Sequence, residues 1–96
     1  IAEQAALAFV AIGNYPDAAT VVKDRIEKRP ANLRLWDLLT IMSVKNDQAR
    51  AAHQQLVAKY NSTSDKKLAS HLAKFANADW PSKLGNKDLT WNNQKI

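Results

Sequence analysis

The sequence contains no cysteine, and it has only two glycines and three prolines in 96 residues. Without cysteine the chain can form no disulfide, and it offers neither a thiolate nucleophile nor a zinc site of the cysteine type. So little glycine and proline leaves few of the turns that a multi-stranded sheet requires, and no glycine-rich loop that could hold a phosphate group. These shortages favour a helical protein and give little support to an enzyme.

Long hydrophobic runs are also missing. The longest apolar stretch extends from Ala5 to Gly13, which is much shorter than the roughly 20 residues of a membrane-spanning helix. No basic segment precedes an apolar run of the kind found in signal peptides. The sequence therefore predicts no membrane span. Because it begins at Ile1 rather than with Met, we expect it to belong to a longer chain, and it leaves the compartment open.

The charge of the chain is mildly basic, with a formal net charge of +5 from 14 Lys and Arg against 9 Asp and Glu. A nucleic-acid-binding protein more often gathers its basic residues on one face or places aromatic residues between them. An alternative function is nevertheless a basic helical module that binds nucleic acid through the lysines of residues 66–95, with Trp80 and Trp91 as stacking platforms. The even spread of charge favours a protein partner instead.

Apolar residues make up 46% of the chain, and they recur with the helical period of 3.6 residues. This period predicts helices over residues 2–12, 16–29, 33–45, 48–60 and 65–77. Gly13 and Pro30 end the first two helices. Asn32 is the expected N-cap of the third helix, and residues 62–65 form a capping box that opens the fifth. The segment 81–96 is polar and aperiodic, and we expect an irregular tail there.

The sequence also repeats itself with a period of 34 residues. The matching pairs are Ala2 and Trp36, Ala5 and Leu39, Ala18 and Ala52, and Val22 and Leu56. A period of this length is typical of helical hairpins that must stack to bury their apolar faces. We therefore expect a core formed around Trp36, Leu39, Ala52 and Leu56, together with Phe9, Ala18 and Val22.

These spacings resemble the tetratricopeptide repeat. The first copy has Ala5-Ala6-x-x-Phe9, Ala18-x-x-x-Val22 and Pro30, and the second has Trp36-x-x-Leu39-Thr40-x-x-Ser43 and Ala52-x-x-x-Leu56. Thr40, Ser43 and Ser64 depart from the glycine, aromatic residue and proline that the family prefers. The resemblance implies an all-α domain over residues 1–80, a short right-handed solenoid of two antiparallel hairpins (2–30 and 33–61) with a capping helix (65–77).

In the tetratricopeptide family the first helix of each hairpin lines a concave groove. The resemblance therefore implies a partner-binding set of Glu3, Leu7, Val10, Arg34, Asp37, Ile41 and Lys45, completed from the fifth helix by His71 and Lys74. These residues combine apolar anchors with charges of both signs, although the same charges also suit a solvated helix face. Trp80 and Trp91 are expected to anchor the tail, either over the end of the array or in a partner interface.

Residues that could carry out chemistry are few. His53 and His71 lack a second ligand at helical spacing, so we expect them on the surface or half-buried rather than bound to metal. Ser62, Thr63 and Ser64 have no glycine elbow around them and are better explained as a helix start. The sequence thus predicts no enzyme, no metal and no cofactor. It favours a protein-interaction scaffold or adaptor that binds a peptide, helix or subunit, with self-association through the uncapped N-terminal edge as a further expectation.

Overall fold

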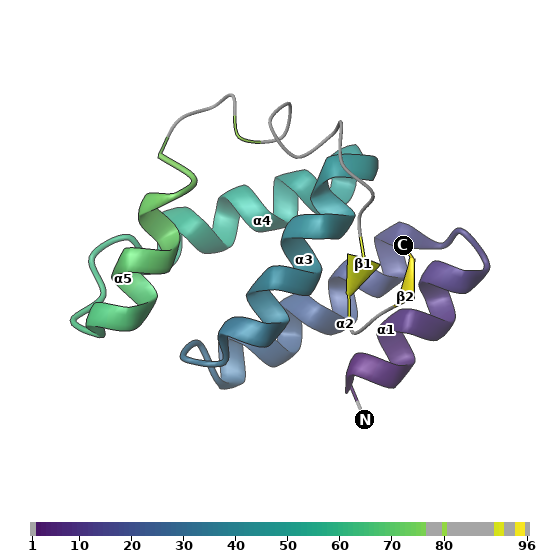
Figure 1. The fold of residues 1–96 in the computed structure, drawn as a ribbon, viewed down its shortest axis with the longest axis horizontal. Helices are drawn as coiled ribbons and strands as arrows, with labels where there is room; N and C mark the ends of the chain where they lie inside the picture. The colour runs from purple at the N-terminus through teal and green to yellow at the C-terminus, as the bar shows by residue number, and fades with distance from the viewer. Residues whose placement is uncertain (1, 77–79, 81–89, 92–93, 96) are drawn as a thin grey trace.

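The computed structural model describes the backbone of residues 2–76, 80, 90–91 and 94–95, and the side chains of residues 4–76 and 80. Over residues 2–76 the fold is all-α, as the sequence predicts (Figure 1). The helices are α1 (Ala2–Ala11), α2 (Tyr15–Lys28), α3 (Leu33–Lys45), α4 (Asp47–Tyr60) and α5 (Lys66–Ala73). The predicted helix over 65–77 is too long, because α5 ends at Ala73 and the Lys74 N–H bonds the carbonyls of His71 and Leu72.

The described residues of the segment 81–96, for which an irregular tail was expected, include a short pair of strands. Strand β1 (Thr90–Trp91) pairs with strand β2 (Gln94–Lys95) in an antiparallel ladder, with Trp91 opposite Gln94. β1 lies beside α3. Two-residue strands leave no periodic pattern in a sequence, which is why the apolar spacing gave no sign of them.

Short polar turns separate the helices. Gly13 has a φ of +77°, a conformation that suits glycine at the end of a helix, and Asn14 accepts a hydrogen bond from the Asp17 N–H at the start of α2. Asn32 precedes α3, but its side chain makes no capping hydrogen bond. At the start of α5 it is Asp65 that caps the helix, accepting from the Leu68 N–H, while Thr63 Oγ1 accepts from the Asp65 N–H.

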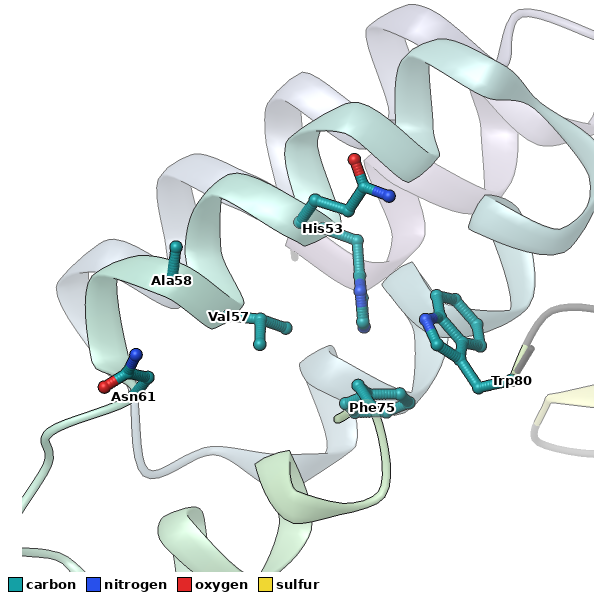
Figure 2. A pocket seen from close by; sticks show the side chains of 7 residues that line it. His53, Val57, Ala58, Asn61, Phe75 and Trp80 are labelled. Carbon is teal, nitrogen blue, oxygen red and sulfur yellow. The ribbon is translucent and has the colours of Figure 1, made fainter. Parts of the chain in front are cut away.

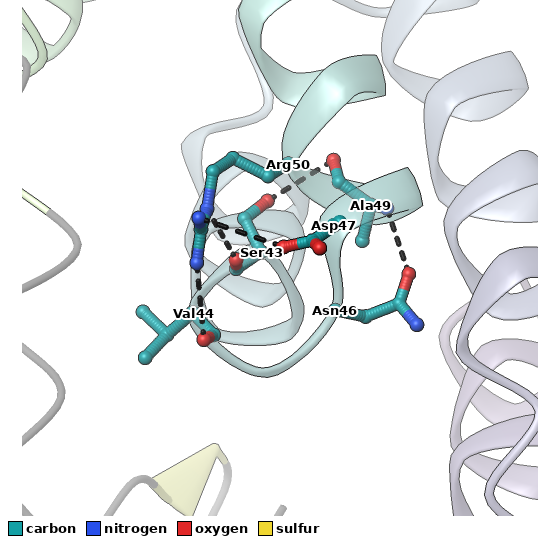
Figure 3. A network of polar contacts seen from close by, with 6 residues as sticks. All are labelled: Ser43, Val44, Asn46, Asp47, Ala49 and Arg50. Atoms are coloured by element: carbon teal, nitrogen blue, oxygen red, sulfur yellow. Dashed lines mark hydrogen bonds and ion pairs between the residues drawn. The ribbon is translucent and has the colours of Figure 1, made fainter.

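The turn between α3 and α4 is closed by Arg50 (Figure 3). Its Nε donates to the Ser43 carbonyl at 3.1 Å, and its guanidinium also donates to the Val44 carbonyl at 3.4 Å. These carbonyls belong to the last turn of α3, where no intrahelical donor remains for them. Asn46 caps α4 by accepting from the Ala49 N–H at 3.0 Å. Arg50 and Asn46 therefore provide hydrogen-bond partners for backbone groups on both sides of the turn.

Helix α2 connects the two hairpins, because it packs against α1, α3 and α4. On the surface, Lys59 pairs with Glu27 at 3.0 Å, and Lys23 donates to Gln55 at 3.0 Å. Both contacts join α2 to α4 across 32 residues of sequence. They are exposed and contribute little stability, but they show that equivalent helices of the two hairpins lie side by side.

The predicted core is confirmed at five of its positions: Ala18, Val22, Trp36, Leu39 and Leu56 are all buried. The Trp36 ring also donates from Nε1 to the Pro30 carbonyl at 2.8 Å, which fixes α3 to the end of the first hairpin. Two expectations were wrong. Phe9 and Ala52 are only half-buried, and the inner face of α4 is formed by Ala49, His53 and Leu56 instead.

Candidate functional site

The most distinctive part of the structure is a cluster of aromatic rings and histidines where α3, α4 and the end of α5 meet. Its members, here called the ring cluster, are Trp36, His53, Tyr60, His71, Phe75 and Trp80. The rings approach one another mostly edge to face, an arrangement favoured by aromatic pairs. The cluster joins the second hairpin to α5 and to the start of the tail.

His53 lies at the centre of the ring cluster and is completely buried. Phe75 meets its ring at a centroid distance of 4.5 Å and an angle of 89°, and Trp80 lies 4.8 Å away at 40°. Its Nε2 is 3.1 Å from Oγ1 of Thr40. The Thr40 hydroxyl itself lies 2.8 Å from the Trp36 carbonyl.

These two contacts determine the tautomer that we assign to His53. A carbonyl oxygen only accepts, so the single hydroxyl proton of Thr40 is donated to Trp36, and His53 must donate from Nε2 to the Thr40 oxygen. The Nδ1 atom of His53 then carries a lone pair. This atom is buried and has no hydrogen-bond partner, and leaving a buried acceptor unsatisfied costs on the order of 1–3 kcal/mol.

Burial also keeps His53 neutral. Removal from water disfavours the charged imidazolium, and the nearby His71 adds repulsion, so that the pKa of His53 falls from 6.5 to about 4. At neutral pH His53 is therefore a hydrogen-bond acceptor at Nδ1 and not a cation. Among the described residues, no side chain donates to its Nδ1 atom.

His71 is the second buried histidine, with 7% of its surface exposed. Its Nε2 lies 3.7 Å from Oδ1 of Asp37, which is within ion-pair range but too long for a hydrogen bond. Burial lowers the pKa of His71, Asp37 opposes this shift, and Lys74 adds to it. His53 and His71 were expected on the surface or half-buried, and both are instead part of the packed interior.

A hollow of about 170 Å³ opens beside His53 (Figure 2). It is lined by His53, Gln54, Val57, Ala58, Asn61, Phe75 and Trp80. Figure 2 shows the His53 ring next to both Phe75 and Trp80, with Val57 on the neighbouring turn of α4. The walls nearest to His53 are thus aromatic or apolar, and the amides of Gln54 and Asn61 are exposed. We call this hollow the His53 pocket.

A second hollow, of about 290 Å³, lies between α2 and α4. Its lining is Pro16, Ala19, Thr20, Lys23, Gln48, Ala51, Ala52 and Gln55. Most of these side chains are exposed or half-buried. Because Ala52 lines this hollow, its side chain is only half-buried and does not belong to the core.

The predicted partner-binding residues fall into separate parts of the fold. On α3, Arg34, Asp37 and Lys45 are exposed and Ile41 is half-buried, so these four residues form a stripe along the outer side of the helix, the α3 stripe. Asp37 of this stripe meets His71 of α5, and the exposed Lys74 follows in the same region. On α1, Leu7 and Val10 are half-buried. The side chain of Glu3 lies outside the described residues.

The two predicted tail anchors have different outcomes. Trp80 is 8% exposed and packs on His53 of α4 and on Phe75. The Trp91 side chain lies outside the described residues, although its backbone belongs to β1. Most of the segment 81–96 also lies outside them.

Sequence reasoning missed the ring cluster as a site. One signal was available: His53 follows Ala49 by four positions and precedes Leu56 by three, a spacing that places all three on one helical face. His53 could therefore have been assigned to the inner face of α4. The partners Thr40, Phe75 and Trp80 come from other elements, and no local spacing in the sequence connects them.

Among the described residues, no three His, Asp or Glu side chains gather closely enough to hold a metal ion. No helix in that part of the chain has both the length and the apolar character required to cross a bilayer. Comparisons with protein-family models, with curated proteins and with solved structures each returned no match. The resemblance to tetratricopeptide repeats thus rests on the sequence spacings given above.

Proposed function

We propose that this chain is a protein-interaction scaffold of stacked, tetratricopeptide-like hairpins, and that it binds an extended peptide segment of a partner along α3. One observation carries the proposal: an extended segment of the chain itself, β1, already lies beside α3. In Figure 1 the β1–β2 pair lies next to the hairpin helices rather than apart from them. A helix that accepts one extended segment alongside it has a surface suited to another.

The chemistry of the α3 stripe supports this proposal. Arg34, Asp37 and Lys45 provide charges of both signs, and Ile41 provides an apolar surface between them. Mixed surfaces of this kind give a peptide both an anchor and a defined register, because charges contribute more to specificity than to affinity. The opposite side of α3 is fully engaged in the core through Leu35, Trp36, Leu38, Leu39 and Met42.

The alternative function, nucleic-acid binding, receives less support. It requires Trp80 as a free stacking platform, whereas Trp80 is buried against His53 and Phe75. A base that stacks on an aromatic side chain needs the face of that ring to be accessible. We therefore do not propose this function.

The proposal is tested with a photo-crosslinking amino acid placed at position 41 on the α3 stripe, and as a control at the exposed position 20 on α2. We expect a protein to be captured from position 41 and not from position 20. The captured protein is then purified and titrated against the wild-type chain and against Asp37→Arg, which should bind at least tenfold more weakly. Equal capture from both positions, or unchanged binding by Asp37→Arg, would overturn the proposal.

A further inference from the structure

We propose that one end of the helical array binds an acidic, extended polypeptide segment of a partner. This end is formed by the second halves of α2 and α4 and the first halves of α3 and α5, over residues 22–39 and 54–69, and is here called the basic end. The binding is attributed to four cations: Arg25, Arg29, Lys66 and Lys67. None of these four residues belongs to the α3 stripe, and the binding is therefore independent of the proposed function.

Contacts between the helices bring the segments of the basic end together. Consecutive helices run in opposite directions, so that the connections α2–α3 and α4–α5 both lie at the left of the array in Figure 1. Glu27 near the end of α2 pairs with Lys59 near the end of α4 at 3.0 Å. Asp37 of α3 approaches His71 of α5 at 3.7 Å. The ends of α2 and α4 thus share one side of the molecule with the starts of α3 and α5.

Most of the net positive charge of the described side chains lies at this end. The basic end contains eight Lys and Arg residues against four Asp and Glu, a net charge of +4, whereas the rest of residues 4–76 contains three against two, a net charge of +1. The basic residues are spread along the sequence, but alternate connections of the array meet at the same end. The fold therefore gathers charges that the sequence separates.

Each acidic residue of the basic end already has a partner within the chain. The contacts are Asp24 with Lys28, Glu27 with Lys59, Asp37 with His71, and Asp65 with the Leu68 N–H. Four exposed cations remain whose side chains form no ion pair or hydrogen bond with any described residue: Arg25, Arg29, Lys66 and Lys67. These side chains are available to the carboxylates of another molecule, with which Arg and Lys form charge-assisted hydrogen bonds.

The local structure of α5 gives no reason for two lysines at its start. Lys66 and Lys67 occupy the first two positions of this helix, where the backbone N–H groups carry a partial positive charge and acidic side chains are favoured. Only Asp65, at the N-cap, follows this preference. Both lysines therefore add to the positive potential of the helix end, and together they attract an anionic group.

The composition of the basic end favours an acidic peptide over a nucleic acid. Its described aromatic rings, Trp36 and Tyr60, pack against each other at a centroid distance of 6.1 Å, so neither is free to stack on a base. Asp24 and Glu27 lie among the cations of α2, and they would repel a phosphate backbone that carries one charge at every unit. A peptide can place its carboxylates at the cations and neutral residues at the acids.

The experiment is a titration of the full chain, labelled with ¹⁵N, with three probes. The first is a peptide of five glutamates alternating with glycine, the second has glutamine in place of each glutamate, and the third is a hexathymidine DNA strand with five phosphates. We expect the glutamate peptide to bind with saturation, about tenfold more tightly than either other probe, and more weakly as salt is added. The amide shifts should centre on Arg29, Lys66 and Lys67.

Variants at exposed positions locate the site. Arg29→Glu and Lys67→Glu should each weaken binding of the glutamate peptide about fivefold or more. Lys45→Glu is the matched control, because it changes the net charge equally but at the far end of α3, and it should weaken binding by less than about twofold. Lys67→Glu places an acidic residue in the first turn of α5, which favours the helix. Its loss of binding therefore cannot be attributed to unfolding.

Three results would overturn the proposal. The first is a glutamate peptide that binds without saturation or no better than its glutamine counterpart. The second is a DNA strand that binds as tightly as the glutamate peptide, which would identify the basic end as a nucleic-acid surface. The third is an equal loss of binding in Lys45→Glu, which would show that binding follows the net charge of the chain or the α3 stripe. The proposed function is tested separately, by crosslinking from position 41.

Discussion

Thr40 and His53 meet across the α3–α4 hairpin, with 3.1 Å between Oγ1 and Nε2. The positions 34 residues earlier in the chain are Ala6 and Ala19, which are both buried. In the first hairpin these places are thus taken by two small residues, and in the second by a hydrogen-bonded polar pair.

Removal of the Thr40 hydroxyl should destabilise the chain. Thr40→Val keeps the shape of the side chain but leaves the His53 Nε2 proton without an acceptor, at a cost of about 1–3 kcal/mol. Thr20→Val is a matched control, because Thr20 makes the same kind of bond to the carbonyl four residues earlier, but on an exposed surface. Urea unfolding should show a loss for Thr40→Val and almost none for Thr20→Val. Equal losses would mean that the His53 contact contributes nothing.

The stability of the chain should fall as the solution becomes acidic. The pKa of His53 is about 4 in the folded chain and 6.5 when unperturbed, so between these values the unfolded state binds more protons and stability decreases as pH falls. The full shift corresponds to about 3 kcal/mol. The lowered pKa of His71 acts in the same direction.

Unfolding by urea at several pH values from 7 to 4 tests this dependence. The slope of stability against pH should be steepest between pH 6.5 and 4, and it should be smaller in His53→Phe, which cannot titrate. A stability that stays constant over this range would contradict the burial of His53.

Two alanines of α4 should respond differently to enlargement. Ala49 is completely buried beneath the end of α3, whereas Ala52 is half-buried at the hollow between α2 and α4. Ala49→Leu should therefore destabilise the chain by about 1–3 kcal/mol through overpacking, and Ala52→Leu by clearly less. Thermal unfolding of the two variants measures this difference in stability. The opposite order would support the sequence-based expectation that Ala52 belongs to the core.

Shortening the side chain of Leu39 should strongly destabilise the folded chain. This residue is fully buried, and Leu39→Ala should lower the free energy of unfolding by about 2–5 kcal/mol. Ile12→Ala is the control, since Ile12 is 76% exposed and its truncation should change stability by less than about 0.5 kcal/mol. Denaturant titration measures both. An unchanged midpoint for Leu39→Ala would contradict the packing described here.

The N-terminal edge should associate weakly. Ile12 is a large hydrophobic residue with 76% of its surface exposed, and Leu7, Phe9 and Val10 of α1 are only half-buried. Such an apolar surface favours a contact between copies of the chain. Sedimentation at several concentrations should show a reversible dimer that Ile12→Lys weakens. A single monomeric species at the highest concentration would contradict this expectation.

The amino-acid sequence was sufficient to predict the helices, their approximate ends and most of the core. Apolar residues at a period of 3.6 identify a helix and its inner face without any knowledge of its neighbours, which is why Val22, Trp36 and Leu56 were assigned correctly. The 34-residue period likewise indicated two similar hairpins before any contact was known. These features are local, or they repeat at a fixed distance, and a sequence displays both.

Tertiary packing, in contrast, is required to explain the ring cluster, the His53 pocket and the position of β1. Thr40, His53, Phe75 and Trp80 come from α3, α4 and the chain beyond α5, and their meeting depends on how the helices cross. The unpaired Nδ1 follows from that meeting, because the Thr40 hydroxyl has one proton and donates it to Trp36. Hydrogen bonds and desolvation act over a few ångströms in space, so residues far apart in the sequence acquire their chemistry only after the chain has folded.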